Sequence, residues 1–252
     1  YGRDRGEASR RMHESLNVKI NMQSLFSVGG DLPPDPRFRR ELQELNPEER
    51  VSHTLVCPMA DIWKAYGEAD IGRIYCEEFH PACYSHYAFD YGHVNLGMTL
   101  TQEKDEYCDF NVDLRAENLP DELKPKCFAE YDPGYVMPDV HPEAACGKSG
   151  FESISVKLYY YILEAALEQF GEAGWDAMRA AMDKMASDGA ARARKTAEKY
   201  SRPFDEQLIF DTYPLTMDRS KTKLWDNYTG HEAVERFMHS FVPAMQRELE
   251  KK

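Results

Sequence analysis

Alternating apolar and polar residues near the middle of the chain predict a β-hairpin. The alternation runs over residues 94–100 and again over residues 108–114. A period of two is typical of half-buried strands, and the polar residues between the segments favour an antiparallel connection. The alternating apolar positions are Val94, Leu96, Met98 and Leu100 in the first segment, and Cys108, Phe110, Val112 and Leu114 in the second.

Helices and one further strand are predicted before this hairpin. Residues 5–25 have helical spacing, and residues 51–57 form a short strand in which Val51 and Leu55 share one parity. Because proline is favoured at the first helical position, Cys57-Pro58 predicts a helix that covers residues 61–66. The next helix begins at Asp70, and Pro81 should end it. Its predicted apolar stripe is Ile71, Ile74, Tyr75 and Phe79.

The remainder of the chain changes from irregular to helical. Residues 117–150 contain five prolines and predict a long connection. Residues 151–252 predict helices over 154–170, over 175–200, and after the capping pattern of residues 229–232. The predicted fold class is α+β, with a small, mainly antiparallel sheet packed by helices and followed by a helical C-terminal segment. The predicted boundaries are 1–116 for the α+β unit, 117–150 for the connection and 151–252 for the helical segment.

Charge and hydropathy narrow the function classes. The chain has 31 basic and 44 acidic side chains and a net charge of −13, which disfavours binding to nucleic acid. The most apolar stretch, residues 158–167, is too short to cross a membrane, so no membrane contact is expected. No secretory signal is visible and the cysteines number six, so we expect reduced thiols in a cytoplasmic protein.

Three cysteines and one histidine are the candidates for chemistry. A thiol at Cys57 would face the unpaired amides of a helix N-terminus, which stabilise a thiolate. Cys76 and His80 are one helical turn apart, with Glu77 between them as a candidate base. Cys108 is on the same face of its predicted strand as the apolar residues, so its side chain lies either in the core or facing a pocket beneath the sheet. Each of these residues also has a purely structural interpretation, as a packed thiol or a solvated side chain.

No metal and no cofactor are predicted. Cys57, Cys76, His80 and Cys108 would form a plausible zinc set, but they lack the short paired spacing of common zinc sites. The chain also has no glycine-rich phosphate loop and no nucleophile elbow. Nucleotide-dependent chemistry is therefore disfavoured.

Three blocks of the sequence resemble the L-2-amino-thiazoline-4-carboxylic acid hydrolase family. The order and spacing of the blocks agree with that family, and Tyr1 to Gly6 resembles its upstream helix motif. The resemblance covers residues 1–114. The blocks are Cys57-Pro58-Met59-Ala60-Asp61-Ile62-Trp63, then Ile71-Gly72-Arg73-Ile74-Tyr75-Cys76-Glu77-Glu78-Phe79-His80-Pro81-Ala82, then Thr99-Leu100-Thr101 with Cys108-Asp109-Phe110.

The resemblance implies a hydrolase that opens a small cyclic C–N substrate, such as a thiazoline, an amidine or a lactam. Cys76 or Cys57 would be the nucleophile, with His80 or Glu77 carrying protons, or Glu77 would activate water directly. Arg5 and Arg73 are candidate carboxylate clamps, and Trp63 and Tyr75 are further candidates for substrate binding. A small molecule is the expected partner, and a homo-oligomer is compatible with this interpretation.

The second half of the chain departs from the family pattern. A tyrosine-rich segment at 158–161 and Phe170-Gly171 follow the hairpin rather than precede residue 1. The helical segment is therefore either a degenerate repeat or a swapped part of a second unit. The alternative function is a non-catalytic binding or assembly subunit in which the cysteine cluster is structural.

Overall fold

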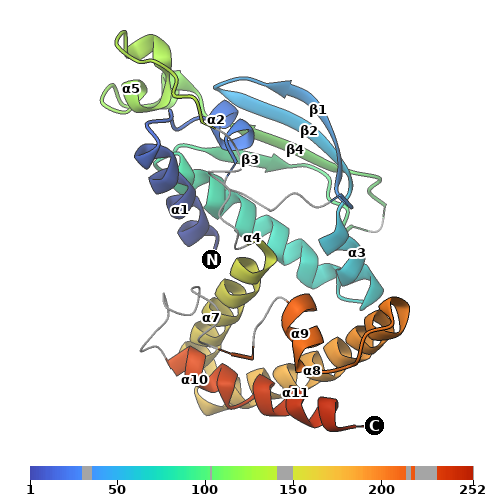
Figure 1. Ribbon diagram of the computed structural model, residues 1–252. Coiled ribbons are helices and arrows are strands. Elements are labelled where there is room, and N and C mark those ends of the chain that lie inside the picture. The colour runs from blue at the N-terminus through green and yellow to red at the C-terminus, as the bar shows by residue number, and fades with distance from the viewer. Residues whose placement is uncertain (30–35, 103, 141–149, 214–216, 219–231, 252) are drawn as a thin grey trace. The chain divides into compact units, whose positions relative to one another are not determined.

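The chain divides into two compact units, Tyr1–Lys148 and Ser149–Lys252 (Figure 1). The computed structural model describes residues 1–29, 36–102, 104–140, 150–213, 217–218 and 232–251. The first unit has an antiparallel sheet packed by helices, and the second is helical. The α+β fold class predicted from the sequence is confirmed.

Two helices replace the single helix expected over residues 5–25. Helix α1 spans Gly2–Ser15 and helix α2 spans Met22–Ser27. Between them Asn17 has a φ of 54°, a left-handed conformation that ends a helix. The side chain of Asn21 accepts a hydrogen bond from the Ser24 amide and so starts α2 as its N-cap.

The sheet has four antiparallel strands in the order β1-β2-β4-β3. Their bounds are Arg39–Leu45 for β1, Glu49–Val56 for β2, His93–Leu96 for β3 and Cys108–Asp113 for β4. The predicted antiparallel pairing of these two segments is confirmed, with Val94 opposite Val112 and Leu96 opposite Phe110, but β3 ends at Leu96 and leaves Met98 and Leu100 outside the strand. Strand β1 was not predicted, because its side chains are mostly exposed and its sequence lacks an apolar alternation.

In strand β2 the buried face is the one that carries polar residues, not the one that carries the apolar residues. Ser52 and Thr54 are buried, whereas Val51 and Leu55 are only half-buried. In the register of the sheet Ser52 is opposite Phe110, and Thr54 is opposite Cys108. The inner face of β2 is therefore polar, and it packs beside an apolar inner face on β4.

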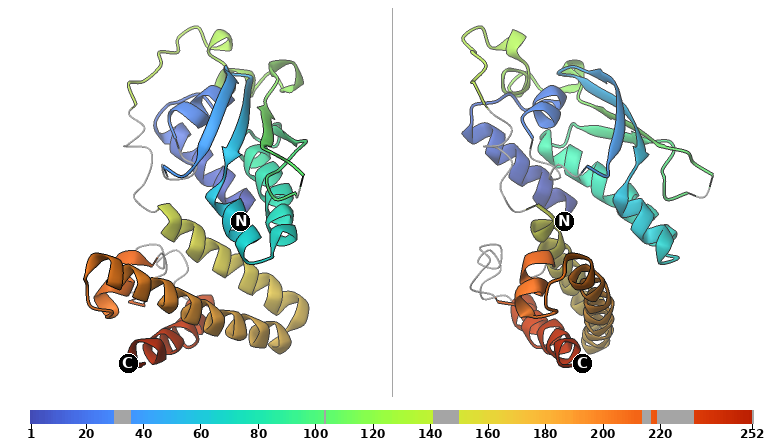
Figure 2. Two further views of the ribbon diagram at one scale, coloured as in Figure 1. Left: turned by 90° about the vertical axis from the view of Figure 1, so that its right-hand side faces the viewer. Right: turned by 45° about the vertical axis from the view of Figure 1, so that its right-hand side comes forward.

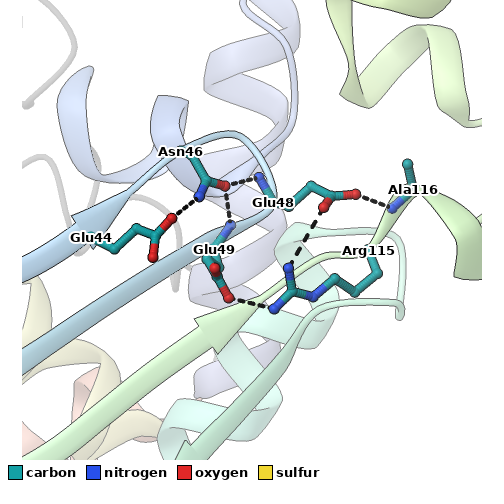
Figure 3. A network of polar contacts seen from close by, with 6 residues as sticks. All are labelled: Glu44, Asn46, Glu48, Glu49, Arg115 and Ala116. Carbon is teal, nitrogen blue, oxygen red and sulfur yellow. Dashed lines mark hydrogen bonds and ion pairs between the residues drawn. The ribbon is translucent and has the colours of Figure 1, made fainter.

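A polar network ties the β1–β2 turn to the end of β4 (Figure 3). The Asn46 side-chain oxygen accepts hydrogen bonds from the amides of Glu48 and Glu49, at 2.8 and 2.9 Å. Both glutamates pair with Arg115, and Glu48 also accepts a hydrogen bond from the Ala116 amide at 2.9 Å. This network holds the turn between β1 and β2 against the chain that follows β4.

Helices α3 and α4 follow the second strand. Helix α3 spans Pro58–Ala65 with Cys57 as its N-cap, as predicted. Helix α4 spans Ala69–Tyr87 and contains Pro81, so the prediction that Pro81 ends the helix is wrong. An interior proline costs about 3 kcal/mol, but the helix continues because Phe79, Cys83, Tyr84 and Tyr87 bury its far half. The predicted apolar stripe is only partly buried, since Ile71 and Ile74 are exposed.

Helix α4 crosses one face of the sheet and packs along α1 (Figure 2). Two glycines of α1 allow this close approach. A Cβ atom at Gly2 would lie 2.6 Å from the Phe79 carbonyl oxygen, and one at Gly6 would lie 2.1 Å from that of Cys83. The Tyr-Gly-Arg-Asp-Arg-Gly motif is thus a helix-packing motif in this structure.

The segment after β4 is packed rather than extended. It contains the short helices η1 Ala116–Asn118, α5 Lys124–Cys127 and η2 Ala129–Tyr131. Cys127 and Phe128 are buried in the core of the first unit. Lys19 donates to Asp132 at 2.6 Å, which ties the segment to the chain before α2. The described part of the predicted 117–150 connection, up to residue 140, therefore includes part of the core of the first unit.

The second unit is a helical bundle. Its helices are α7 Gly150–Phe170, α8 Glu172–Tyr200, α9 Glu206–Thr212, α10 Glu232–Met238 and α11 Phe241–Glu250. The predicted final helix is divided between α10 and α11, and most of its predicted capping pattern lies outside the described residues. Phe237 stacks on Phe241 and meets the edge of Tyr159 in the bundle core. In the described part of the chain, no helix has the length and apolarity needed to span a bilayer.

A fully buried histidine links α1, α4 and the end of α2. His13 Nε2 lies 2.9 Å from the Gly29 carbonyl oxygen, so this nitrogen carries a proton and donates it. His13 Nδ1 lies 2.8 Å from the Tyr87 hydroxyl, which in turn donates to the Asn21 carbonyl oxygen at 3.2 Å. Burial lowers the pKa of His13 below its usual value of 6.5, and the hydrogen bond to Gly29 offsets this only in part.

We expect acid to destabilise the first unit through His13. The unfolded chain binds a proton near pH 6.5, whereas the folded chain does so only at lower pH, so stability is complete above 6.5 and falls below it. Between pH 7.5 and pH 5.5 this histidine should account for up to about 1.4 kcal/mol of the loss. Urea unfolding followed by the fluorescence of Trp63 measures this effect, with Trp175→Phe and Trp225→Phe in both proteins so that only the first unit is reported. The free energy of unfolding should change less with pH in His13→Gln than in the parent. An unchanged pH effect in His13→Gln would contradict the assignment.

Candidate active site

A cavity of about 710 Å³ lies in the first unit, between the inner face of the sheet and helix α4. We call it the sheet–α4 cavity. Strands β1 to β4, helices α3 and α4, and the beginning of α1 all contribute side chains to its lining. The described lining includes Tyr1, Phe26, Phe38, Arg40, Arg50, Thr54, Cys57, Trp63, Tyr75, Cys76, Phe79, His80, Tyr84, Thr99, Cys108 and Phe110.

Three thiols that are distant in sequence meet at this cavity. Cys57 is the N-cap of α3, Cys76 is on α4, and Cys108 begins β4. The side chain of Cys57 makes no capping hydrogen bond. Cys83, two turns further along α4 from Cys76, is instead buried where α4 packs on α1. Each of the three cavity cysteines is a free thiol.

Burial makes two of the three thiols poor nucleophiles in the resting protein. Desolvation raises the pKa of Cys76 to about 12, and repulsion from Cys108, Cys57 and Glu77 adds to this rise. Desolvation also raises the pKa of Cys108, although the Leu100 amide donates to its sulfur at 3.2 Å and opposes the rise. The thiolate expected at Cys76 beside His80 is therefore disfavoured at neutral pH.

His80 is held among aromatic rings at the cavity wall. Its imidazole stacks parallel to Tyr84 at a centroid distance of 5.9 Å and meets Phe110 edge-on at 5.1 Å. These contacts place a half-buried proton carrier on the same cavity as Cys57 and Cys108. All four candidates for chemistry, Cys57, Cys76, His80 and Cys108, line this one cavity.

The predicted base Glu77 and the predicted clamps Arg5 and Arg73 are not part of the described lining. Arg73 donates to Glu77 at 2.7 Å on the outer face of α4, where their side chains are 50% and 47% exposed. Arg5 is half-buried on α1. None of these three residues is among those that line the cavity. The structure therefore separates Glu77, Arg73 and Arg5 from the thiols.

The predicted aromatic residues do line the cavity. Trp63, Tyr75, Phe79 and Tyr1 form a continuous series of ring contacts at centroid distances of 5.3, 5.0 and 5.0 Å. Gly72 makes room for this series, because a Cβ atom there would lie 2.3 Å from the Trp63 ring. Trp63 and Tyr75 are thus in position to contact an apolar ligand.

Two cavity arginines were missed from the sequence. Arg50 and Arg40 extend into the lining from β2 and β1, and none of the described lining residues is an aspartate or a glutamate. Arg50, Ser52 and Thr54 occupy alternate positions of β2 and therefore lie on one face of the strand. This row of polar residues was the signal in the sequence that could have pointed to Arg50. An uninterrupted polar parity on a central strand indicates a polar cavity as readily as it indicates solvent.

Within the described residues, no three histidine, cysteine, aspartate or glutamate side chains are grouped so that they could hold a metal ion. Comparisons with protein-family models, with curated proteins and with solved structures each find no match to this chain.

Proposed function

We propose that the chain is a hydrolase that opens a cyclic C–N substrate, such as a thiazoline, an amidine or a lactam, with a cysteine as nucleophile. The observation that carries this proposal is the shared cavity of Cys57, Cys76, Cys108 and His80. These residues come from α3, α4 and β4, and aromatic rings surround them. A thiol, a proton carrier and a pocket are the minimum for covalent catalysis on an electrophilic carbon.

Cys57 is the proposed nucleophile. It is the N-cap of α3 and lines the same cavity as His80, and its side chain is engaged in no capping hydrogen bond. Cys76 has a pKa of about 12 because of burial, which argues against the same role for it. Glu77 is exposed and paired with Arg73, so His80 is the proposed proton carrier.

The reaction on a cyclic amidine begins when the Cys57 sulfur bonds to the ring carbon and the thiol proton passes to the ring nitrogen through His80. The ring C–N bond then breaks. Its electrons remain on the ring nitrogen, which leaves as an amine after taking a proton from the exocyclic nitrogen. Water next adds to the same carbon, and the C–S bond to Cys57 breaks as the thiol regains a proton. The net change is the addition of one water molecule, which gives a carbamoyl product.

A second candidate is a non-catalytic binding or assembly subunit. Two observations favour it: the raised pKa values of Cys76 and Cys108, and the lack of a carboxylate base in the described lining. In this case the same cavity would hold a ligand without turnover.

Turnover and covalent trapping distinguish the two candidates. We expect at least one member of a panel of cyclic amidines, lactams and hydantoins to gain one water in the presence of the full chain, as measured by mass spectrometry. After acid quenching during turnover, peptide mapping should find an adduct on Cys57 and none on Cys76. Full activity in a Cys57→Ser/Cys76→Ser double variant would eliminate the thiol route. Binding without turnover across the panel would favour the second candidate.

A further inference from the structure

Two of the three thiols that line the sheet–α4 cavity have no role in the proposed reaction. Cys76 and Cys108 come from α4 and β4, the two layers between which the cavity lies. Neither is fully buried, and both are free thiols. Besides Cys57, the remaining described cysteines are Cys83 and Cys127, which are buried in the packed interior of the first unit. Two accessible thiols that share one cavity are candidates for reversible oxidation.

The packing of α4 on the sheet places Cys76 across from Cys108. His80 of α4 meets the Phe110 ring of β4 edge-on, at a centroid distance of 5.1 Å. Cys76 is one helical turn before His80, which corresponds to about 6 Å along α4. Cys108 is two residues before Phe110, which corresponds to about 7 Å along β4. The two thiols are therefore displaced from one contact by nearly equal distances.

Both displacements lead toward α3. Strand β2 pairs with β4 so that Thr54, near the end of β2, lies opposite Cys108, and α3 begins directly after β2. On α4, Tyr75 is the neighbour of Cys76 and contacts Trp63 of α3 at a centroid distance of 5.3 Å. Cys76 and Cys108 thus lie at the same end of the cavity, where the end of β2 and the beginning of α4 meet α3 (Figure 1).

The surroundings of the two sulfurs are consistent with such a pair. Burial raises the pKa of Cys76 to about 12, and repulsion from Cys108 is the next largest cause, so the two sulfurs lie within electrostatic range of each other. The Leu100 amide donates a hydrogen bond to the Cys108 sulfur at 3.2 Å and favours negative charge there. Cys108 should therefore be oxidised before Cys76. Because burial disfavours both thiolates, the reduced pair is not stabilised and the disulfide is favoured at equilibrium.

We infer that Cys76 and Cys108 form a reversible oxidation site, at which a hydroperoxide converts the two thiols into a disulfide across the sheet–α4 cavity. In the first step the Cys108 sulfur bonds to the terminal oxygen of the hydroperoxide as the O–O bond breaks. The departing alkoxide takes the thiol proton and leaves as an alcohol, or as water when the oxidant is hydrogen peroxide.

The second step joins the two sulfurs. The Cys76 sulfur attacks the sulfenic acid of Cys108, the S–O bond breaks, and the released hydroxide takes the Cys76 proton and leaves as water. In total the two sulfurs lose two electrons, which the oxygens of the hydroperoxide gain. A dithiol reductant reverses the change by thiol–disulfide exchange.

This disulfide would also control access to Cys57. Its two sulfurs must be about 2 Å apart, so the bond draws α4 toward β4 at the end of the cavity where α3 begins. Cys57 is the N-cap of α3 and lines the same cavity. Formation of the disulfide itself does not depend on the proposed function, but an oxidised chain would be inactive if Cys57 is the nucleophile.

Disulfide mapping of the full chain tests this inference, with hydrogen peroxide as the oxidant at about pH 8.5, near the ordinary pKa of a thiol. Unreacted thiols are then blocked with N-ethylmaleimide, and the chain is digested without a reductant. Mass spectrometry should find a cross-linked peptide pair that joins Cys76 to Cys108, and dithiothreitol should remove it. Cys83 and Cys127 should stay reduced. A disulfide between other cysteines, or oxidation to sulfinic acid without a disulfide, would overturn the inference.

Serine variants test the order of the two steps. In Cys76→Ser the sulfenic acid of Cys108 should be trapped by dimedone, whereas Cys108→Ser should give no dimedone adduct at Cys76. The matched control is Cys57→Ser, which removes the third thiol of the cavity and should leave the yield of the disulfide unchanged. Loss of the disulfide in Cys57→Ser would contradict the assignment. If a variant does not fold, mapping of the parent chain decides the matter.

Labelling of Cys57 tests the control of access. A bulky maleimide should label Cys57 several-fold more slowly in the oxidised chain than in the reduced chain, and dithiothreitol should restore the rate. Equal rates would reject the control of access.

These outcomes separate the inference from the proposed function. A reversible Cys76–Cys108 disulfide in a chain that turns over no ring would leave the inference standing and reject the hydrolase. Ring opening by a chain that forms no such disulfide would do the reverse.

Discussion

Replacement of Cys57 by serine should lower kcat/KM for ring opening by about 10³-fold or more. The reason is that a hydroxyl at this position cannot form the thiolate that attacks the ring carbon, and loss of a nucleophile typically has an effect of this size. The substitution removes no capping hydrogen bond, since Cys57 makes none. Folding and ligand binding should therefore persist in the variant.

The informative comparison is Cys76→Ser, which changes a second thiol of the same cavity. Because burial keeps Cys76 protonated, we expect this variant to lose no more than about 10-fold in kcat/KM. Steady-state kinetics on the best substrate of the panel provides the test. Similar losses in both variants, or a larger loss in Cys76→Ser, would show that Cys57 is not the nucleophile.

Gly6→Ala should destabilise the first unit by about 3 kcal/mol or more. A Cβ atom at Gly6 would lie 2.1 Å from the Cys83 carbonyl oxygen and 2.9 Å from the Tyr87 amide nitrogen. Both contacts are with the backbone of α4, so the clash cannot be relieved by a side-chain rotation. Relief requires α1 to move away from α4, and overpacking of this kind typically costs 1–3 kcal/mol or more.

Gly97→Ala is the matched control for this prediction. The nearest atom to a Cβ at Gly97 is 3.8 Å away, an ordinary contact, so this variant should unfold at nearly the same urea concentration as the parent. With Trp175→Phe and Trp225→Phe in all chains, the fluorescence of Trp63 reports on the first unit alone. The packing assignment fails if Gly6→Ala and Gly97→Ala have the same midpoint. Because Tyr1 lines the cavity, Gly6→Ala should weaken ligand binding as well.

The elements with strong local signals were predictable from the sequence. The hairpin of β3 and β4 follows from its alternation, and the start of α3 follows from Cys57-Pro58. The helical second half follows from its composition and spacing. In each case the signal lies within a few residues of the element, because periodicity, capping and proline geometry act locally.

The site required the tertiary structure. Pro81 ends an isolated helix, but α4 continues through it because the sheet and α1 bury its second half. Glu77 looks like a base beside Cys76 until the packing of α4 turns it outward to Arg73. The sequence offered Cys57, Cys76, His80 and Cys108 as candidates for chemistry, and the structure adds the cavity that all four line and the burial of Cys76. Desolvation and the choice of buried face depend on contacts between segments distant in sequence, which no local pattern specifies.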